Sequence, residues 1–216
     1  MTSPWLSIPL EDYEGHMSSA GVQQLPALAE LFKYALERYA PESLAVLGVA
    51  GGNGLEHVDS AVTKRLVAVD INPIYLDTVQ QRFGAKPGME LRCCDLSRSD
   101  LSLEPVALVH AALIFEHTGL GRPLENALSL VAPGGKLSVV LQLPSESGKA
   151  IAGTGYASMQ SLSRDFALID VNEFQRLLVT RQFHLIEERC RPVPAGKALW
   201  LGIFAKSRGT AVAVLS

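Results

Sequence analysis

The residues best suited to chemistry are a dense group of glycines and an acid that follows it. The segment Gly48-Val-Ala-Gly-Gly-Asn-Gly54 comes directly after a short apolar run at 44–47. A glycine-rich turn at the end of a strand lets a ligand approach the backbone, and a helix that begins behind it offers free N–H groups. Asp70 ends a second apolar run, and a carboxylate there can accept hydrogen bonds from both hydroxyls of a ribose. These residues predict a site for an adenosine-containing cofactor.

The elements that must position these residues alternate in type along the chain. Short apolar runs predict strands at 44–49, 65–70, 89–94, 105–113 and 136–143. Apolar residues at three- and four-residue spacing predict helices at 22–39, 53–62, 73–83, 123–131 and 171–181. Because the strands are apolar on both faces and are separated by helices, they predict a parallel sheet covered on both sides. Two final strands, 184–190 and 197–206, are joined by a short turn and predict an antiparallel hairpin.

Composition limits the class of protein. Hydrophobic residues make up 48% of the chain and charged residues 19%, as in a folded globular domain. The net charge of -3 and the lack of a basic cluster disfavour nucleic acid as a partner. No apolar run approaches the ~20 residues of a membrane helix, and the N-terminus has no signal pattern. We therefore expect a soluble, cytoplasmic protein, a monomer or homodimer, with Cys93, Cys94 and Cys190 as buried thiols.

Five blocks in order resemble the class I S-adenosylmethionine-dependent methyltransferases. VLGVAGGNG resembles their motif I, whose usual form is an acid followed by Gly-x-Gly-x-Gly, and it is followed by VAVDIN, LRCCDL, VHAALIFEH and APGGKLSVVLQ. The resemblance covers residues 42–206. It implies a Rossmann-like, doubly wound α/β fold with helices on both faces of a seven-stranded sheet of order 3-2-1-4-5-7-6, mostly parallel with an antiparallel last strand.

The resemblance also divides the chain and assigns its cofactor site. A single domain, 1–216, would comprise an N-terminal lid segment and helix (1–41), a cofactor-binding core (42–143), an acceptor-side loop, helix and hairpin (144–206) and a frayed tail (207–216). Asp70 would hold the ribose, and Asp95 with Leu96 would meet the adenine. The implied cofactor-binding residues are Gly48, Ala50, Gly51, Gly52, Asn53, Gly54, Asp70, Ile71, Asp95, Leu96 and Ala111.

One position departs from the family pattern. Gly48 stands where the family has Asp or Glu, an acid that helps to fix the methionyl ammonium. Glu116 or the N-terminal segment would have to replace it. This departure keeps open a protein that binds S-adenosylmethionine without catalysis.

The acceptor side offers five candidate catalytic residues. Glu116 and His117 follow the end of the fourth strand, where acceptors bind in the family. His110, on the apolar strand itself, fits a core histidine better than a general base. Tyr13 and His16 belong either to a lid over the site or to a packing strap. The carboxylates and amide of metal-dependent members are missing, so we expect no metal.

The function expected from the resemblance is direct in-line transfer of a methyl group from S-adenosylmethionine to an unidentified acceptor. A small molecule is favoured as the acceptor because basic residues are not clustered. A nicotinamide-dependent oxidoreductase is the weaker alternative, since the Gly-x-Gly-x-x-Gly fingerprint is incomplete whether it starts at Gly48 or at Gly52.

Overall fold

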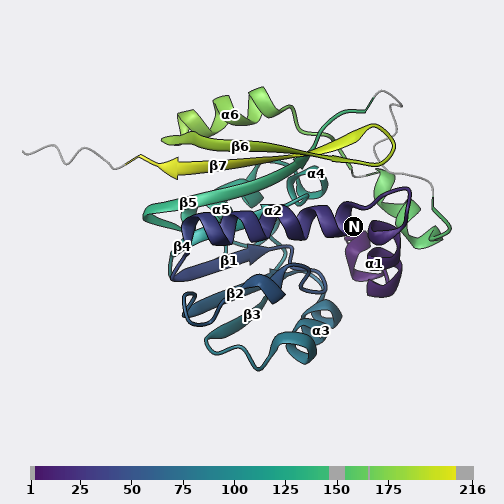
Figure 1. Ribbon diagram of the computed structural model, residues 1–216, viewed down its shortest axis with the longest axis horizontal. Helices are drawn as coiled ribbons and strands as arrows, with labels where there is room; N and C mark the ends of the chain where they lie inside the picture. Colours follow the sequence, from purple (N-terminus) through teal and green to yellow (C-terminus); the bar gives the residue numbers. More distant parts are fainter. Residues whose placement is uncertain (1–2, 146–153, 165, 208–216) are drawn as a thin grey trace, which may run out of the picture.

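A computed structural model describes residues 3–145, 154–164 and 166–207. Seven strands form one sheet in the order β3-β2-β1-β4-β5-β7-β6, which runs from bottom to top in Figure 1. The strands are β1 Ser43–Leu47, β2 Arg65–Asp70, β3 Met89–Cys93, β4 Val106–Ala112, β5 Val131–Gln142, β6 Phe183–Val193 and β7 Lys197–Lys206. Strands β1 to β5 pair in parallel, and β7 is antiparallel to both β5 and β6. The predicted strand order and the reversed last strand are confirmed.

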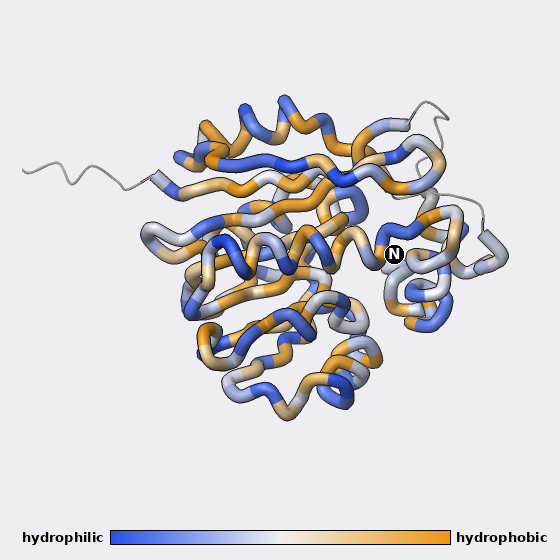
Figure 2. The backbone as a smooth tube through the Cα atoms, in the orientation of Figure 1, coloured by the Kyte–Doolittle hydropathy of each residue, from blue (hydrophilic) through white to orange (hydrophobic). Residues whose placement is uncertain are grey.

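Helices cover both faces of this sheet. They are α1 Leu10–Ser18, α2 Gln24–Tyr39, α3 Pro73–Phe83, α4 Phe115–Thr118, α5 Arg122–Ser129 and α6 Val171–Thr180, with short 3₁₀ helices η1 Pro4–Leu6, η2 Leu55–His57 and η3 Ala157–Arg164. Successive strand residues point to opposite faces, so Leu44 packs with α2 and α3 whereas Ala45 packs with α5 and α6. Figure 2 shows the apolar residues gathered in the central strands, between helices with mixed surfaces. The doubly wound architecture follows from this two-sided burial.

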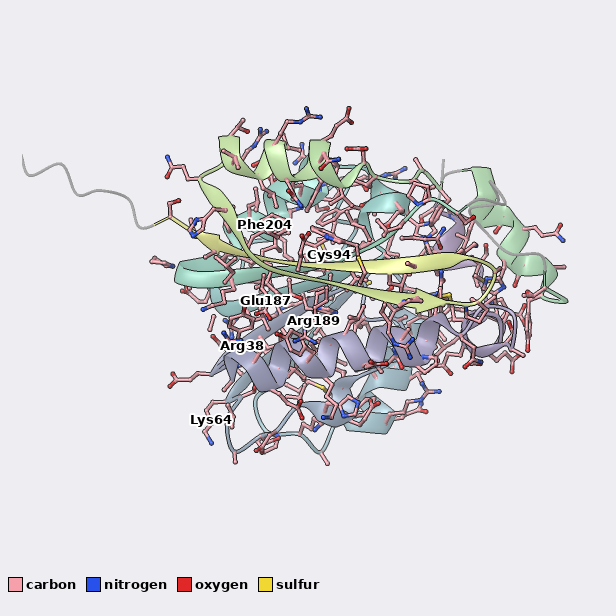
Figure 3. The ribbon with its side chains drawn as sticks, turned by 45° about the horizontal axis from the view of Figure 1, so that its top comes forward. Arg38, Lys64, Cys94, Glu187, Arg189 and Phe204 are labelled. Atoms are coloured by element: carbon pink, nitrogen blue, oxygen red, sulfur yellow. The ribbon has the colours of Figure 1, made fainter. Side chains whose placement is uncertain are left out.

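Helix α2 is tied to the antiparallel end of the sheet by Glu187 of β6. The Tyr39 hydroxyl donates to Glu187 Oε2 at 2.8 Å, the Tyr34 hydroxyl donates to Oε1, and Arg38 Nε lies 3.4 Å from Oε2. Arg189 stacks over the Tyr34 ring (Figure 3). The start of α2 borders the site described below, so this cluster fixes that helix against β6.

The predicted helix at 53–62 is wrong. Only the 3₁₀ turn η2 forms there, because Gly52 and Gly54 hold φ of 87° and 89°, which a right-handed helix cannot contain. Val58 then returns to extended backbone. The chain therefore leaves the glycine turn without a covering helix, and Phe32 of α2 packs against Gly54 instead.

Three smaller expectations also differ from the structure. Strand β5 begins at Val131, so Gly134 and Gly135 lie inside it, at a register shift against β4, rather than before the predicted strand at 136–143. Cys93 and Cys190 are exposed and Cys94 is half-buried, since β3 and β6 are the edges of the sheet. The predicted acceptor-side loop contains the 3₁₀ helix η3; residues 146–153 and 165, like most of the predicted tail, lie outside the described residues.

Candidate active site

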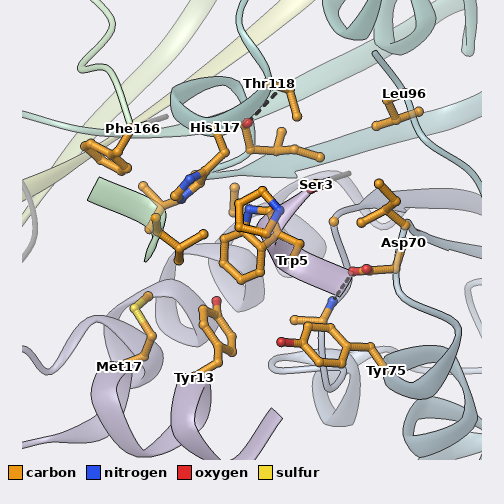
Figure 4. A pocket seen from close by; sticks show the side chains of 18 of the residues that line it. Ser3, Trp5, Tyr13, Met17, Asp70, Tyr75, Leu96, His117, Thr118 and Phe166 are labelled. Atoms are coloured by element: carbon orange, nitrogen blue, oxygen red, sulfur yellow. Dashed lines mark hydrogen bonds between the residues drawn. The ribbon is translucent and has the colours of Figure 1, made fainter. Parts of the chain in front are cut away.

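A cavity of about 370 Å³ lies at the carboxyl ends of β1, β2 and β4 (Figure 4). This edge of a parallel sheet is where doubly wound folds bind ligands, and the volume lies at the lower end of the range typical for small-molecule sites. The wall facing the sheet comes from the N-terminal segment, which contributes Trp5, Tyr13 and His16. The cavity is therefore built from strand ends on one side and from η1 and α1 on the other.

Asp70, the last residue of β2, lines this cavity, and the backbone holds its side chain in place. It is 8% exposed, and its Oδ2 accepts a hydrogen bond from Ala50 N at 2.8 Å while Oδ1 accepts one from Asn72 N at 2.9 Å. Burial raises the pKa of the carboxyl, and the hydrogen bonds from backbone N–H groups oppose this rise. Each carboxylate oxygen can accept a second bond, so hydroxyls from the cavity can still bind there.

One part of the glycine turn lines the cavity, and the other part packs against the surrounding helices. Gly48 and Ala50 line the cavity. A side chain at Gly51 would meet Glu14 and Arg82, and one at Gly52 would meet Phe83. These close contacts explain the need for glycine: the turn lets α1, α2 and α3 pack directly onto it.

The predicted cofactor-binding residues fall into two groups, those that line the cavity and those that do not. Those that line the cavity are Gly48, Ala50, Asp70, Ile71, Asp95 and Leu96. Those outside its lining are Gly51, Gly52, Asn53, Gly54 and Ala111. Asn53 donates from Nδ2 to Leu25 O at 2.9 Å, and Ala111 is fully buried within β4. The second set supports the shape of the turn and the strand.

Gly48 has a backbone conformation that disfavours the acid expected at this position in the family pattern. Its φ is +69°, a conformation that L side chains rarely adopt, and a Cβ there would lie 2.9 Å from Ile114 Cδ1. An acidic side chain would therefore be strained and would require the Ile114 methyl group to move. A side-chain carboxylate for the methionyl part of a cofactor would have to come from another segment.

Three aromatic rings line one side of the cavity: Figure 4 shows Phe166 and His117 at the upper left and Trp5 next to His117. Trp5 meets the edge of the His117 ring at 4.9 Å between centroids, and His117 meets Phe166 at 5.0 Å. Burial lowers the pKa of His117 to about 4, so the ring is neutral at pH 7. Its Nδ1 is buried without a partner among the described residues. A neutral imidazole of this kind can accept a proton or a hydrogen bond from a ligand.

Glu116 and His110 lie behind the cavity, outside its lining. Glu116 Oε1 accepts a hydrogen bond from Gln142 N at 2.8 Å, and burial raises the pKa of this carboxyl to about 7. His110 Nδ1 lies 2.9 Å from Ser138 Oγ, and its ring stacks on Phe32. Burial lowers the pKa of His110 to about 3, which fits a neutral side chain of the core.

The N-terminal segment is held over the cavity by contacts with α3 and with Asn72, the residue that precedes this helix. Asn72 Nδ2 donates to Trp5 O at 2.9 Å, and the Tyr75 hydroxyl donates to Ile8 O at 2.9 Å. Arg82 Nη2 donates to Glu14 Oε2 at 3.0 Å. Burial raises the pKa of Tyr13, which lines the cavity as a neutral phenol.

Sequence reasoning missed a polar group at the far end of the cavity, formed by Gln24, Gln142 and Lys197. Gln24 Nε2 donates to Gln142 Oε1 at 2.7 Å. Gln142 ends β5, and Lys197 begins β7 beside it, where Leu143 N donates to Ala198 O at 2.9 Å. A signal was available, since the carboxyl end of β5 and the start of an antiparallel neighbour must lie at one edge.

Two features are not found in the part of the chain that the structure describes. No group of three or more His, Cys, Asp or Glu side chains there could hold a metal ion. No described helix has the length and apolar character needed to cross a membrane.

No protein-family model and no curated protein sequence matches the chain. Solved structures match its fold. The N-methyltransferase NodS from Bradyrhizobium japonicum WM9, in complex with S-adenosyl-L-homocysteine, has a TM-score of 0.65 at 16% identity, over 91% of this chain and 97% of that one. Magnesium protoporphyrin IX methyltransferase from Synechocystis PCC 6803, with bound S-adenosylmethionine, has a TM-score of 0.60 at 11% identity, over 86% and 79%.

An rRNA methylase from Streptococcus thermophilus has a TM-score of 0.53 at 18% identity, over 83% of this chain and 94% of that one. The protoporphyrin methyltransferase and the rRNA methylase are named for different acceptors. The chain has the fold of the class I S-adenosylmethionine-dependent methyltransferases, as the sequence blocks predicted.

Proposed function

We propose that this protein is an S-adenosylmethionine-dependent methyltransferase that acts on a small-molecule acceptor. One observation carries the proposal: a cavity at the carboxyl ends of the strands has Asp70 beside the glycine turn at one end and, next to it, a mostly apolar, aromatic wall. The fold is the one in which NodS and the protoporphyrin methyltransferase hold this cofactor or its product.

The residues at the β2 end fit an adenosine. The Asp70 carboxylate would accept the ribose hydroxyls, and Ile71 with Leu96 would border the base. Asp95 lines the same wall, and its Oδ1 accepts a hydrogen bond from Ser97 N at 2.9 Å. When bound, S-adenosylmethionine supplies a methyl group already activated on a sulfonium, so the chain needs no metal to polarise it.

The chain's own task is to orient the acceptor and to exclude water. Holding two reactants in line can lower a barrier by several kcal/mol, within the roughly 7–11 kcal/mol known for well-aligned reactions. The Trp5, His117 and Phe166 rings would exclude water from that line. His117 is the candidate base for an acceptor that arrives protonated, and its pKa of about 4 makes it a weak one that suits an acidic acceptor better than an ordinary amine or alcohol.

The size and lining of the cavity favour a small acceptor. A volume of about 370 Å³ must hold the nucleoside as well as the acceptor, and the N-terminal segment covers the mouth. The net charge of -3 also gives little attraction for a phosphate backbone. An RNA acceptor, as for the rRNA methylase, is therefore the less favoured outcome.

Calorimetric titration with S-adenosylhomocysteine and with NADH tests the cofactor. We expect saturable binding of the first at micromolar concentrations or below and no heat from the second. The reverse result would overturn the proposal and favour an oxidoreductase. A binding protein without catalysis is the second candidate, because Gly48 stands in the place of the usual acid. It would bind S-adenosylhomocysteine but form none from S-adenosylmethionine with any acceptor.

A further inference from the structure

The two ends of the cavity differ in charge. Both carboxylates among the described lining residues, Asp70 and Asp95, lie at or just after the ends of β2 and β3, where Arg98 Nε lies 3.5 Å from Asp95 Oδ2. The opposite end is formed by β5, β7 and α1, and its cationic and imidazole side chains among the described residues are Lys197 and His16. Within the described lining, carboxylates are therefore confined to the β2 end, and the end that would face an acceptor holds a lysine.

Lys197 is placed unusually for a lysine. It is the first residue of β7, and it lines the cavity although it is only 8% exposed. Burial lowers the pKa of its ammonium. A charge in such a partly desolvated site interacts with an opposite charge more strongly than it would in water. This position suits the binding of an anion from within the cavity.

His16 of α1 lies close enough to Lys197 to sense its charge. Burial is the main cause of the lowered pKa of His16, and the charge of the Lys197 ammonium is the second. His16 Nδ1 lies 2.7 Å from Thr154 Oγ1, which fixes the ring, and the Gln24–Gln142 amide pair lines the same end. An anion here would meet an ammonium, an imidazole and amide groups from three different elements.

The buried acid Glu116 lies behind this end of the cavity and not in its lining. Its Oε1 is engaged by Gln142 N. Its pKa of about 7 leaves it largely protonated in slightly acidic solution. Burial keeps the Tyr13 phenol neutral as well.

Between the two ends lies the aromatic wall. The rings of Trp5, His117 and Phe166 meet edge to face, and Met159 and Leu162 of η3 extend the apolar surface. Flat apolar ligands pack well on such surfaces. We propose that the methyl acceptor is a small aromatic carboxylate, whose carboxylate binds Lys197 and His16 and whose ring lies against Trp5, His117 and Phe166. This rests on the methyltransferase function proposed above.

The protein itself supplies an optical probe for the test. It has two tryptophans: Trp5 lines the cavity, whereas Trp200 is buried in β7 and donates to Glu188 Oε2 at 2.8 Å. Ligand binding should therefore change the Trp5 emission alone. The variant W5F identifies this component by removing it.

The protein, saturated with S-adenosylhomocysteine, is titrated with 4-hydroxybenzoate and with its neutral amide, 4-hydroxybenzamide. We expect the acid to bind at least about tenfold more tightly, since hydrogen bonds to a charged group contribute that much or more. Equal affinity for the two, or binding of neither, would overturn the proposal. This comparison needs no variant, so a folding defect cannot obscure it. Tighter binding of phenyl phosphate than of the acid would assign the site to phosphates and overturn the carboxylate.

Variants then locate the anion. K197M should abolish the preference for the acid, K197R should retain most of it, and K33M, on an exposed lysine of α2 outside the cavity, should change nothing. A preference that survives in folded K197M would contradict the assignment.

The cofactor's own carboxylate is the competing source of an anion. If Lys197 bound it, K197M would weaken S-adenosylhomocysteine binding at least about tenfold and leave 5′-methylthioadenosine, which lacks that carboxylate, unaffected. That result would overturn the acceptor assignment. We expect both nucleosides to bind K197M within about twofold of the parent. If the parent bound no S-adenosylhomocysteine at all, the proposed function itself would fail.

Discussion

The two ends of the cavity are built in different ways. The β2 end consists of strand ends and a glycine turn, where Asp70 is held by the backbone N–H groups of Ala50 and Asn72. The β5 end consists of side chains from α1, α2, β5 and β7, such as His16, Gln24 and Lys197. Backbone geometry thus defines the nucleoside end, which suits a ligand common to a whole fold class. Individual side chains define the other end, which suits an acceptor peculiar to one protein.

The largest effect that we expect concerns Asp70. Loss of two hydrogen bonds to a charged acceptor, at roughly 1.5–3 kcal/mol each, should weaken S-adenosylhomocysteine binding at least ~100-fold in Asp70→Ala. Asp70→Asn, which keeps one acceptor, should lose less. Calorimetry measures both.

A change in stability is expected as well. Because the carboxylate also binds two backbone N–H groups, Asp70→Ala should destabilise the ligand-free protein by about 1–3 kcal/mol. Asp77→Ala, in the exposed part of α3, is the control. Unchanged affinity in Asp70→Ala would show that Asp70 does not bind the nucleoside, and the contrast drawn between the two ends of the cavity would then fail.

A second prediction concerns Glu116, behind the β5 end. Its pKa is about 7 in the folded protein and 4.5 ordinarily. Its favourable contribution is therefore fully present below about pH 4.5 and is lost as the pH rises to about 7. The loss amounts to about 3 kcal/mol, since one pKa unit corresponds to about 1.4 kcal/mol.

Glu116→Gln should remove this pH dependence and should melt at a higher temperature than the parent at pH 8. Thermal melts between pH 4.5 and 8 measure it, with Glu37→Gln, an exposed acid of α2, as the control. Parallel melting profiles for the parent and Glu116→Gln would show that this carboxyl ionises as freely as one in water.

The third prediction concerns Gly48, the residue at the β2 end of the cavity that departs from the family pattern. Gly48→Asp restores the usual acid, but the backbone there has φ of +69° and the Ile114 methyl group would have to move. We expect a loss of stability of about 1–3 kcal/mol, typical of a side chain in a strained conformation, without tighter S-adenosylhomocysteine binding. Gly21→Asp, at an exposed glycine with open space and no positive φ, is the control. A stable variant that binds more tightly would show that position 48 tolerates the usual acid and that its absence from this chain has no structural cause.

The smallest effect is expected at the N-terminal wall. Trp5→Ala should weaken binding of the acceptor or of S-adenosylhomocysteine about tenfold while changing the melting temperature little, because the ring faces the cavity. Leu6→Ala, a neighbouring exposed side chain, is the control. Lost stability together with unchanged affinity would identify residues 3–18 as a packing strap instead of a lid.

The contrast between the β2 end and the β5 end of the cavity also explains which features could be predicted from the sequence. The strands and the place of Asp70 at a strand end were predictable because apolar runs, glycines and strand ends are local signals, whereas the sheet order came from the resemblance to the methyltransferases. The helix at 53–62 was wrong because two positive φ angles outweighed its apolar spacing. The proximity of His16 to Lys197 could not be predicted, since it requires α1 to fold over the start of β7, which no local pattern specifies.

Transfer of a labelled methyl group tests the central claim most directly. The protein is incubated with methyl-labelled S-adenosylmethionine and a cell extract, and label is then measured separately in small molecules, protein and nucleic acid. The account predicts label in a small, acidic, aromatic compound, formed by the parent protein and not by Asp70→Ala. Label confined to RNA or protein would contradict the small-molecule acceptor, and binding of S-adenosylmethionine with no label in any fraction would contradict catalysis itself.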